Sequence, residues 1–302
     1  MTTDWAIILA GGEGSRLRQV TSTAFPGRPK QFCSLVTSRT LLDETRARVA
    51  LSIDPHRTLL AVTQAHRLFY EREAQELPEE LLVEQPVNRG TTMAMALALG
   101  RIRRLDSSAV VAVFPSDHYY DNVPAVQQAL DIAFHGARRN PGRMFLVGST
   151  PDAPEMEYGW IEPGAPLTNP FAGDRLLNVR QFIEKPGQMT ASELVDRGWL
   201  WNTFIIVGRL NAFLNALRLG VPFAGRFAAL AAAAPDLESE RELAARAYRG
   251  TPTSGFCADV LTKWPSLCAV SRMIGAGWID VGQPGRLEIA RQHAGLRSQA
   301  AS

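Results

Sequence analysis

Cysteine is scarce in this sequence of 302 residues, and its spacing supports neither a disulfide framework nor a zinc site. Cys33, Cys257 and Cys268 are odd in number and form no C-x-x-C pair, whereas disulfide-rich domains and zinc knuckles use paired cysteines. Long apolar runs are also lacking: the run at 5–10 is shorter than a signal sequence requires, and none approaches the roughly eighteen residues of a membrane span. We therefore expect a cytoplasmic protein that is neither secreted nor membrane-spanning.

An excess of either charge is missing as well. The chain has 32 Lys and Arg against 30 Asp and Glu, a net charge of +2. This balance argues against a nucleic-acid-coating protein, but it leaves room for a local basic pocket that binds a small anion. The composition, 46% hydrophobic and 21% charged, is ordinary for a globular protein and excludes collagen-like, coiled-coil and disordered chains.

The first half of the chain alternates between buried strands and helices. Apolar runs at 5–10, 58–62, 109–114 and 144–148 are typical of strands that are buried on both faces of a parallel sheet. Helical stretches separate these runs, and the stretch at 91–104 is apolar almost all round. The pattern predicts βαβ units, and hence an α/β, Rossmann-like fold with a mixed, mostly parallel central sheet flanked by helices.

After about residue 150 the pattern changes. Short apolar runs are separated by turns rich in Pro and Gly rather than by regular helices. We interpret residues 151–265 as a substrate-binding lobe grafted onto the sheet. Helices resume from Leu210, a last strand is expected at 267–270, and residues 285–302 are expected to form a closing helix and a tail.

A glycine loop follows the first predicted strand. The segment GGEGSRL (11–17) is followed by PKQF (29–32), and glycines at this place let backbone N–H groups approach a phosphate. A dinucleotide fingerprint is excluded because Leu17 stands at its third glycine, and a P-loop is excluded because Ser15 and Arg16 follow Gly14. A structural turn with solvated cations accounts for the loop equally well.

A carboxylate is expected at the carboxyl end of another strand. Asp117 closely follows the run that ends at Phe114, where open α/β sheets bind ligands. A carboxylate at this place suits Mg²⁺, which takes one or two protein carboxylates together with substrate phosphates. The alternative is an Asx-turn beside Pro115. We expect the neighbouring His118 to be a hydrogen-bonding wall residue and leave it out of the ligand set.

Other polar residues also have two interpretations. Pro186 predicts an extended backbone for Lys185, whose ammonium group either neutralises a phosphate or is solvated. Asn202 offers both a donor and an acceptor for hydroxyl groups, and we expect Trp201 beside it to pack rather than to stack on a ligand. In the segment before the helix at 91–104, Asn88 and Thr91 are either ligand contacts or helix N-caps.

Seven motifs occur in an order that resembles the sugar-1-phosphate nucleotidylyltransferases. The P-K-Q form of the first motif points to the mannose-1-phosphate guanylyltransferase (GDP-mannose pyrophosphorylase) branch, in a short form without the C-terminal β-helix domain. The resemblance spans residues 5–285. The motifs are GGEGSRL with PKQF (11–17 and 29–32), QPVNRGT (85–91), PSDH (115–118), YGWI (158–161), EKP (184–186), WNT (201–203) and GWIDVG (277–282).

The resemblance implies a single nucleotidyltransferase domain at 1–284, with a nucleotide half at 1–150 and the sugar-phosphate lobe at about 151–265. It implies three groups of site residues and one cofactor, Mg²⁺, held by Asp117 and Asp280. The nucleotide-binding residues are Ala10, Gly11, Gly12, Gly14, Ser15, Arg16, Gln85, Asn88, Gly90 and Thr91. The sugar-phosphate-binding residues are Tyr158, Gly159, Glu184, Lys185 and Asn202, and the catalytic residues are Arg16, Lys30, Asp117 and Lys185.

The reaction implied is guanylyl transfer from GTP to mannose 1-phosphate, with small molecules and neither nucleic acid nor membrane as partners. Arg16 would hold the β and γ phosphates, Lys30 the departing charge and Lys185 the sugar phosphate. Asn88 to Thr91 and Met93 depart from the usual pattern of the family, which leaves the base and the sugar open. A sugar-nucleotide-dependent glycosyltransferase and a non-catalytic sugar-nucleotide-binding paralogue remain alternatives. The oligomeric state is open too, with a homodimer as one alternative.

Overall fold

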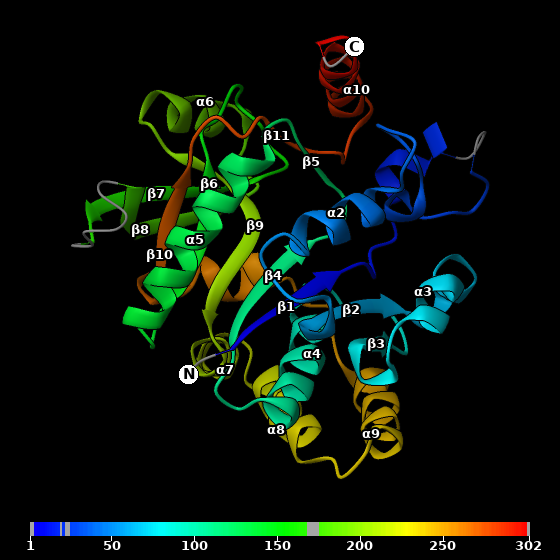
Figure 1. Ribbon diagram of the computed structural model, residues 1–302. Helices are drawn as coiled ribbons and strands as arrows, with labels where there is room; N and C mark the ends of the chain where they lie inside the picture. Colours follow the sequence, from blue (N-terminus) through cyan, green and yellow to red (C-terminus); the bar gives the residue numbers. More distant parts are fainter. Residues whose placement is uncertain (1–2, 19, 22–24, 168–174, 301–302) are drawn as a thin grey trace.

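A nine-stranded sheet forms the centre of the molecule. Figure 1 shows the computed structural model, which describes residues 3–18, 20–21, 25–167 and 175–300. The strand order is β3-β2-β1-β4-β9-β6-β10-β8-β7. The strands are β1 (Asp4–Leu9), β2 (Thr58–Thr63), β3 (Leu82–Gln85), β4 (Val110–Pro115), β6 (Met144–Ser149), β7 (Gly159–Pro166), β8 (Leu176–Glu184), β9 (Leu200–Arg209) and β10 (Cys268–Met273).

The sheet is mixed, as the sequence predicts. β9 pairs antiparallel with β4, β6 and β7, and β8 pairs antiparallel with both β10 and β7. The other four pairings are parallel, so that β8 and β9 run against the other strands of this sheet. The Rossmann-like α/β fold is therefore confirmed.

Both faces of the sheet are covered, which explains the unbroken apolar runs of the strands. In β1, Ile7 belongs to one core cluster, whereas Ala6 and Ile8 belong to the other. The first cluster includes side chains of four α-helices and the second side chains of three. The first four are α4 (Thr91–Leu105), α7 (Leu210–Gly220), α8 (Pro222–Ala233) and α9 (Leu237–Gly250), and the other three are α2 (Leu41–Val49), α5 (Val123–Arg139) and α6 (Gln188–Asp196).

The segment 151–265 is built differently from the expected grafted lobe. Its strands β7, β8 and β9 belong to the main sheet, and β9 lies in the middle of it between β4 and β6. The expectation of turns without regular helices was wrong for residues 188–196, which form α6. β9 carries a long buried run, and its side chains pack in both core clusters. Its place between β4 and β6 makes the sheet continuous.

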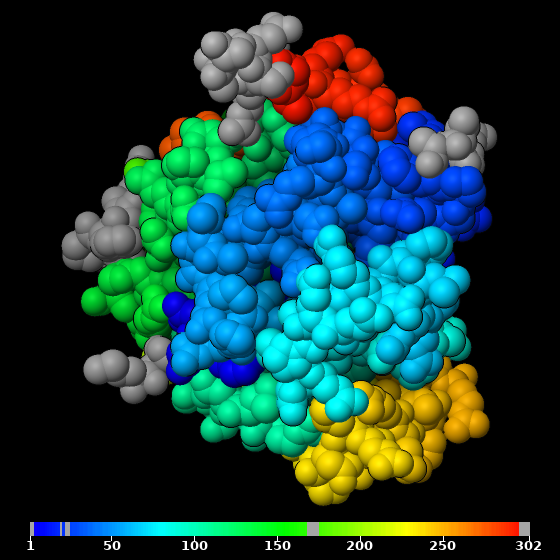
Figure 2. Space-filling model, turned by 45° about the vertical axis from the view of Figure 1, so that its right-hand side comes forward, coloured from blue at the N-terminus to red at the C-terminus, as the bar shows by residue number. Residues whose placement is uncertain are grey.

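A second, two-stranded sheet and a third core cluster lie beside the main sheet. β5 (His118–Tyr120) pairs antiparallel with β11 (Trp278–Asp280). Leu17, Ile279 and Leu287 pack together in the third cluster, which joins the glycine loop to β11 and to α10 (Pro284–Ala300). Figure 2 shows α10 in red beside the blue N-terminal segments. A short helix, α3 (Glu71–Glu76), precedes β3. Among the described residues no helix combines the length and apolarity needed to cross a membrane.

Candidate active site

A pocket of about 370 Å³ opens at the carboxyl ends of β1 and β4, where α/β sheets bind ligands. Most of the predicted site residues line it. Of those predicted to bind the nucleotide, these are Gly11, Gly12, Gly14, Arg16, Gln85, Asn88, Gly90 and Thr91; of those predicted to bind the sugar phosphate, they are Tyr158, Gly159, Glu184 and Asn202; Lys30, Asp117 and Asp280 line the pocket too. Ala10, Ser15 and Lys185 are not among the lining residues.

Gln31 fixes the glycine loop in place. Its side-chain Nε2 donates to the carbonyl oxygen of Ala10 at 2.8 Å and to that of Gly12 at 2.9 Å. Gly14 has φ 61°, and a Cβ there would lie 3.0 Å from the backbone nitrogen of Lys30. A side chain at position 14 would therefore be strained both by its backbone conformation and by this contact. The backbone N–H of Ala10 donates to Ala61 in the sheet, so it is not free for a ligand.

The loop before α4 packs against residues 254–256, which lie between α9 and β10. Gly90 has φ 82°, and a Cβ there would collide with the carbonyl oxygen of Ser254. Asn88 Oδ1 accepts from the backbone N–H of Gly90 at 2.9 Å, and Thr91 Oγ1 accepts from that of Phe256 at 2.9 Å. The alternative that Asn88 and Thr91 cap α4 was wrong, because Gly90 is the N-cap residue and provides no side chain.

Lys30 joins the two predicted metal ligands. Its Nζ lies 2.9 Å from Asp117 Oδ2 and 3.5 Å from Asp280 Oδ1, and it donates to the carbonyl oxygen of Val281 at 2.8 Å. Burial lowers the pKa of Lys30, but the two carboxylates more than offset this, and the pKa is raised. Burial likewise raises the pKa of Asp280, but Lys30 and the other nearby positive groups outweigh it, and the pKa is lowered. Lys30 and Asp280 are therefore charged at neutral pH.

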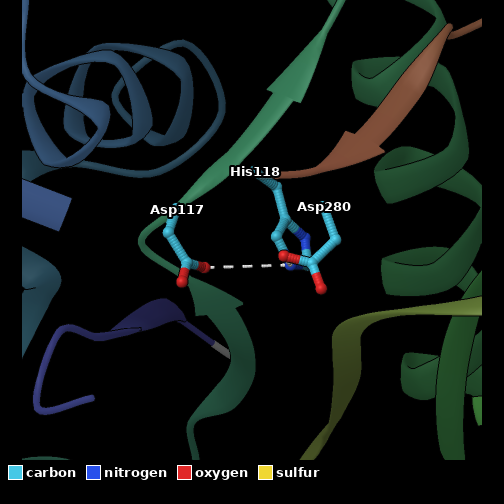
Figure 3. A group of neighbouring side chains, drawn as sticks. All are labelled: Asp117, His118 and Asp280. Atoms are coloured by element: carbon cyan, nitrogen blue, oxygen red, sulfur yellow. Dashed lines mark ion pairs between the residues drawn. The ribbon is translucent and has the colours of Figure 1, made fainter. Parts of the chain in front are cut away.

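The pairing of β5 with β11 explains how Asp280 reaches Asp117 across 163 positions of sequence. Asp280 stands opposite His118 in the antiparallel register. His118 is the residue that follows Asp117 in the sequence. Figure 3 shows the three side chains converging, with His118 beside the carboxyl group of Asp280. Gly282 allows this approach, since a Cβ there would lie 3.1 Å from the carboxylate of Asp280 and 3.2 Å from Arg16 Nη2.

Carboxylate oxygens of Asp117 and Asp280 and a ring nitrogen of His118 lie within 4.8 Å of one another. Trp278 Nε1 donates to His118 Nδ1 at 3.0 Å, and burial lowers the pKa of His118. A neutral imidazole that accepts at Nδ1 carries its proton on Nε2. His118 therefore faces the carboxylates as a donor and not as a ligand. Two carboxylates remain as candidate ligands, and hard oxygen donors of this kind fit Mg²⁺.

Aromatic side chains surround the residues that are predicted to bind the sugar phosphate. Trp201 is buried, and its ring packs edge-on against Tyr158 with centroids 5.2 Å apart, so it packs as predicted. The next residue, Asn202, accepts at Oδ1 from the backbone N–H of Phe204 and donates from Nδ2 to the sulfur of Cys257 at 3.4 Å. Phe204 has φ 59°, an unfavourable conformation for a residue with a side chain, of the kind that clusters at functional sites.

Lys185 departs from its predicted conformation. Its φ is 50°, so the expectation of an extended backbone before Pro186 was wrong. The backbone N–H of Lys185 donates to the carbonyl oxygen of Tyr158 at 3.1 Å, and this tertiary contact outweighs the local preference. The side chain is half exposed, and its Nζ lies 3.5 Å from Glu157 Oε2. Burial raises the pKa of the adjacent Glu184, with Lys185 opposing the shift and Glu157 adding to it.

His118 lines the pocket as the hydrogen-bonding wall residue that the sequence predicts. Sequence reasoning missed other pocket residues: Gln31, Glu157, Phe204, Cys257 and Trp278. Gln31 and Trp278 lie inside the quoted motifs, and Glu157 directly precedes YGWI, so their positions offered a signal. Cys257 offered none. It lies on a π-helical turn, Cys257–Leu261, and it reaches the pocket only because the segment 254–256 packs on the start of α4.

The comparison with known proteins agrees with this geometry. Residues 5–294 match the family described as "Nucleotidyl transferase". The chain belongs to this nucleotidyl transferase family. It is 30% identical over 281 residues to the alginate biosynthesis protein AlgA of Pseudomonas syringae pv. tomato, with 91% of this chain and 56% of that protein covered. It is 29% identical to the mannose-1-phosphate guanylyltransferase of Klebsiella pneumoniae, with 70% of this chain and 44% of that protein covered.

The chain thus spans about half the length of the curated relatives that it matches. Among solved nucleotidyl transferase-like structures, "mannose-1-phosphate geranyltransferase" from Thermus thermophilus superposes with a TM-score of 0.79 at 27% identity. The superposition covers 93% of this chain and 77% of that one. The recognition of a sugar-1-phosphate nucleotidylyltransferase from the motifs is therefore confirmed at the level of the family.

Proposed function

We propose that the protein transfers a guanylyl group from GTP to mannose 1-phosphate and releases pyrophosphate. An oxygen of the sugar phosphate attacks the α-phosphorus of GTP, the bond from that phosphorus to the bridging oxygen breaks, and GDP-mannose forms. The observation that supports this best is the meeting of Lys30, Asp117 and Asp280 at the base of one pocket. The glycine loop and the YGWI segment line the same pocket.

The attacking group is already an anion, so no covalent nucleophile or strong base is needed. Catalysis then depends on positioning and on the neutralisation of charge. Gly11, Gly12 and Gly14 would place backbone against the triphosphate, and Arg16 would hold its β and γ phosphates. Lys30 would stabilise the departing pyrophosphate, since its buried ammonium group stays charged beside the aspartates.

The two aspartates would hold Mg²⁺, which when bound supplies positive charge at the α-phosphate. His118 would keep Asp280 in place from its position across the β5–β11 pair. On the sugar side, Glu184 and Asn202 would contact hydroxyl groups, and Lys185 would turn from Glu157 to the sugar phosphate.

The preference for guanine rests on the QPVNRGT loop and on the mannose-1-phosphate guanylyltransferase relative. In this loop, Gln85 Nε2 donates to the carbonyl oxygen of Val62 at 3.3 Å. The hydroxyl of Tyr248 donates to the carbonyl oxygen of Met93 at 3.0 Å and lies 3.5 Å from Gln85 Oε1. The contact with Val62 orients the amide, so Gln85 would present a donor and an acceptor to a base.

A panel of nucleoside triphosphates against hexose 1-phosphates, with released pyrophosphate as the readout, tests the proposal. We expect the highest kcat/KM with GTP and mannose 1-phosphate, ATP as the nearest competitor of GTP, and poor use of pyrimidines. A higher kcat/KM with UTP or CTP would contradict the guanylyl assignment. Sugar transfer from a sugar nucleotide without pyrophosphate release would favour a glycosyltransferase, and binding without turnover would favour a non-catalytic paralogue.

A further inference from the structure

One carboxylate oxygen links the two half-sites of the pocket. Glu157 Oε2 lies 3.0 Å from Arg16 Nη1 and 3.5 Å from Lys185 Nζ. Arg16 belongs to the glycine loop, whereas Lys185 follows the end of β8. Two cations assigned to two different phosphate ligands therefore share a single internal counter-ion.

The negative charge around the pocket opposes the binding of an anionic ligand while Glu157 contacts Arg16 and Lys185. The lining side chains include two cations, Arg16 and Lys30, but four acids. Lys30 lies beside Asp117 and Asp280 and offsets part of their charge, and Glu184 is half-buried with a raised pKa. Glu157 is the acid that pairs with Arg16, and its oxygen occupies the place beside Arg16 that a phosphate oxygen would take.

Glu157 also has room to leave this place. Its side chain is 39% exposed, and those of Arg16 and Lys185 are 46% and 51% exposed. Ion pairs with this exposure are weak because water screens them. A triphosphate carries several charges and makes bidentate contacts with an arginine, so it outcompetes a single carboxylate for Arg16.

Building on the proposed function, we propose that Glu157 is a positioning residue, a displaceable counter-ion that couples the two phosphate sites. In the ligand-free pocket it holds Arg16 and Lys185 close together. A triphosphate that binds Arg16 repels the carboxylate, which then leaves Lys185 as well. The sugar phosphate finds Lys185 already free, so each ligand increases the affinity for the other, as linkage requires.

Isothermal titration calorimetry of the full chain tests this with inorganic triphosphate and mannose 1-phosphate as probes, at one MgCl₂ concentration. Each probe is titrated alone and in the presence of the other, into the native protein and into Glu157→Gln. We expect the variant to bind each probe alone about two- to fivefold more tightly, the range given by a weak exposed ion pair. The affinity gain that one probe gives the other should be smaller in the variant than in the native protein.

Glu162→Gln is the matched control. It removes the same charge from β7, the strand that begins two residues after Glu157, but Glu162 pairs with Arg197 at 3.6 Å and does not line the pocket, so both affinities should be unchanged. Glu157→Asp is a second variant, since the shorter side chain cannot reach both cations, and it should show the same direction. Weaker binding of each probe alone, or an unchanged coupling between them, would overturn the proposal.

The assays separate this inference from the proposed function. The titration with inorganic triphosphate alone involves neither base nor sugar. Tighter binding by Glu157→Gln in that titration, together with no turnover of any GTP and sugar phosphate pair, would reject the proposed function and leave the role of Glu157 at the phosphate site supported. Turnover of GTP and mannose 1-phosphate with unaltered triphosphate affinity in Glu157→Gln would reject the inference alone.

Discussion

The ammonium group of Lys30 lies 2.9 Å from Oδ2 of Asp117, and Lys30 is itself buried. The sequence contains three lysines, of which Lys30 and Lys185 are at the proposed site and Lys263 is on the surface. Lys263 therefore serves as the control position for substitutions of Lys30 and Lys185.

Lys30→Met should lower both activity and stability. The change leaves Asp117 and Asp280 close together without their counter-charge, which we expect to reduce the free energy of unfolding by about 1–3 kcal/mol. Turnover should fall about 10²- to 10³-fold, the usual effect of losing one electrostatic donor. Denaturant unfolding and pyrophosphate release measure the two effects. Lys263→Met, at a half-exposed position, should change neither, and an equal loss in both variants would contradict the role of Lys30.

Asp117 and Asp280 should act as one unit. Either substitution to Ala should remove most turnover, and the double variant should be little worse than the worse single variant, since residues that share one task are strongly non-additive. The fold should survive, because Lys30 keeps one carboxylate partner in each single variant. The Mg²⁺ dependence of turnover in the three variants measures this. Multiplicative losses, or an unchanged metal requirement in Asp280→Ala, would leave Asp117 as the only metal ligand.

Much of the fold follows from local patterns. Runs such as the one at 5–10 identify β1 because a strand with two covered faces must be apolar throughout, and most motif residues reach the pocket because the carboxyl ends of neighbouring strands meet at one edge. The pairing of β5 with β11 was not predicted. Each strand is three residues long, too short to show periodicity, and only the family resemblance suggested that Asp280 lies beside Asp117.

Tertiary contacts explain the other differences from the sequence predictions. The conformation of Lys185 is set by its backbone hydrogen bond to Tyr158, which a rule based on the following proline does not include. Cys257 lies in the pocket because of contacts more than 160 positions away along the chain, such as that between Phe256 and Thr91. Such contacts leave no periodic signal in the sequence around position 257.

Lys185→Ala should act mainly on the sugar phosphate. The change removes a charge-assisted contact of about 1.5–3 kcal/mol, which corresponds to about a ten- to 150-fold loss in kcat/KM. The loss should appear with mannose 1-phosphate, whereas GTP affinity without sugar should change little. Steady-state kinetics and calorimetric titration with GTP measure the two, with Lys263→Ala as the control. An equal weakening of GTP binding would place Lys185 on the triphosphate.

Glu184→Gln should change the pH dependence of stability. Burial raises the pKa of Glu184 in the folded protein, so in the pH range above its ordinary value the folded state binds more protons than the unfolded state. The contribution of Glu184 to native stability is therefore lost as the pH rises from the pKa of this group in the unfolded state through its pKa in the folded state. The free energy of unfolding of the variant minus that of the native protein should increase with pH in this range and then level off. A pH-independent difference would contradict the raised pKa.

Cys257 should limit the space available to the sugar, and its thiol should take no part in the reaction. Burial raises the pKa of its thiol well above the ordinary value, so it is protonated at neutral pH and should be alkylated slowly. Cys257→Ser keeps the volume and an acceptor for Asn202, and it should retain near-native kinetics. Cys257→Phe places a ring against Asn202 and should raise the KM for the sugar phosphate by about tenfold or more, while the Kd for GTP changes less than about twofold.

The KM for the sugar phosphate is measured by kinetics and the Kd for GTP by calorimetry. Loss of GTP binding in Cys257→Phe would show that this thiol adjoins the nucleotide, and native KM values for both substrates would show that the sugar does not reach it.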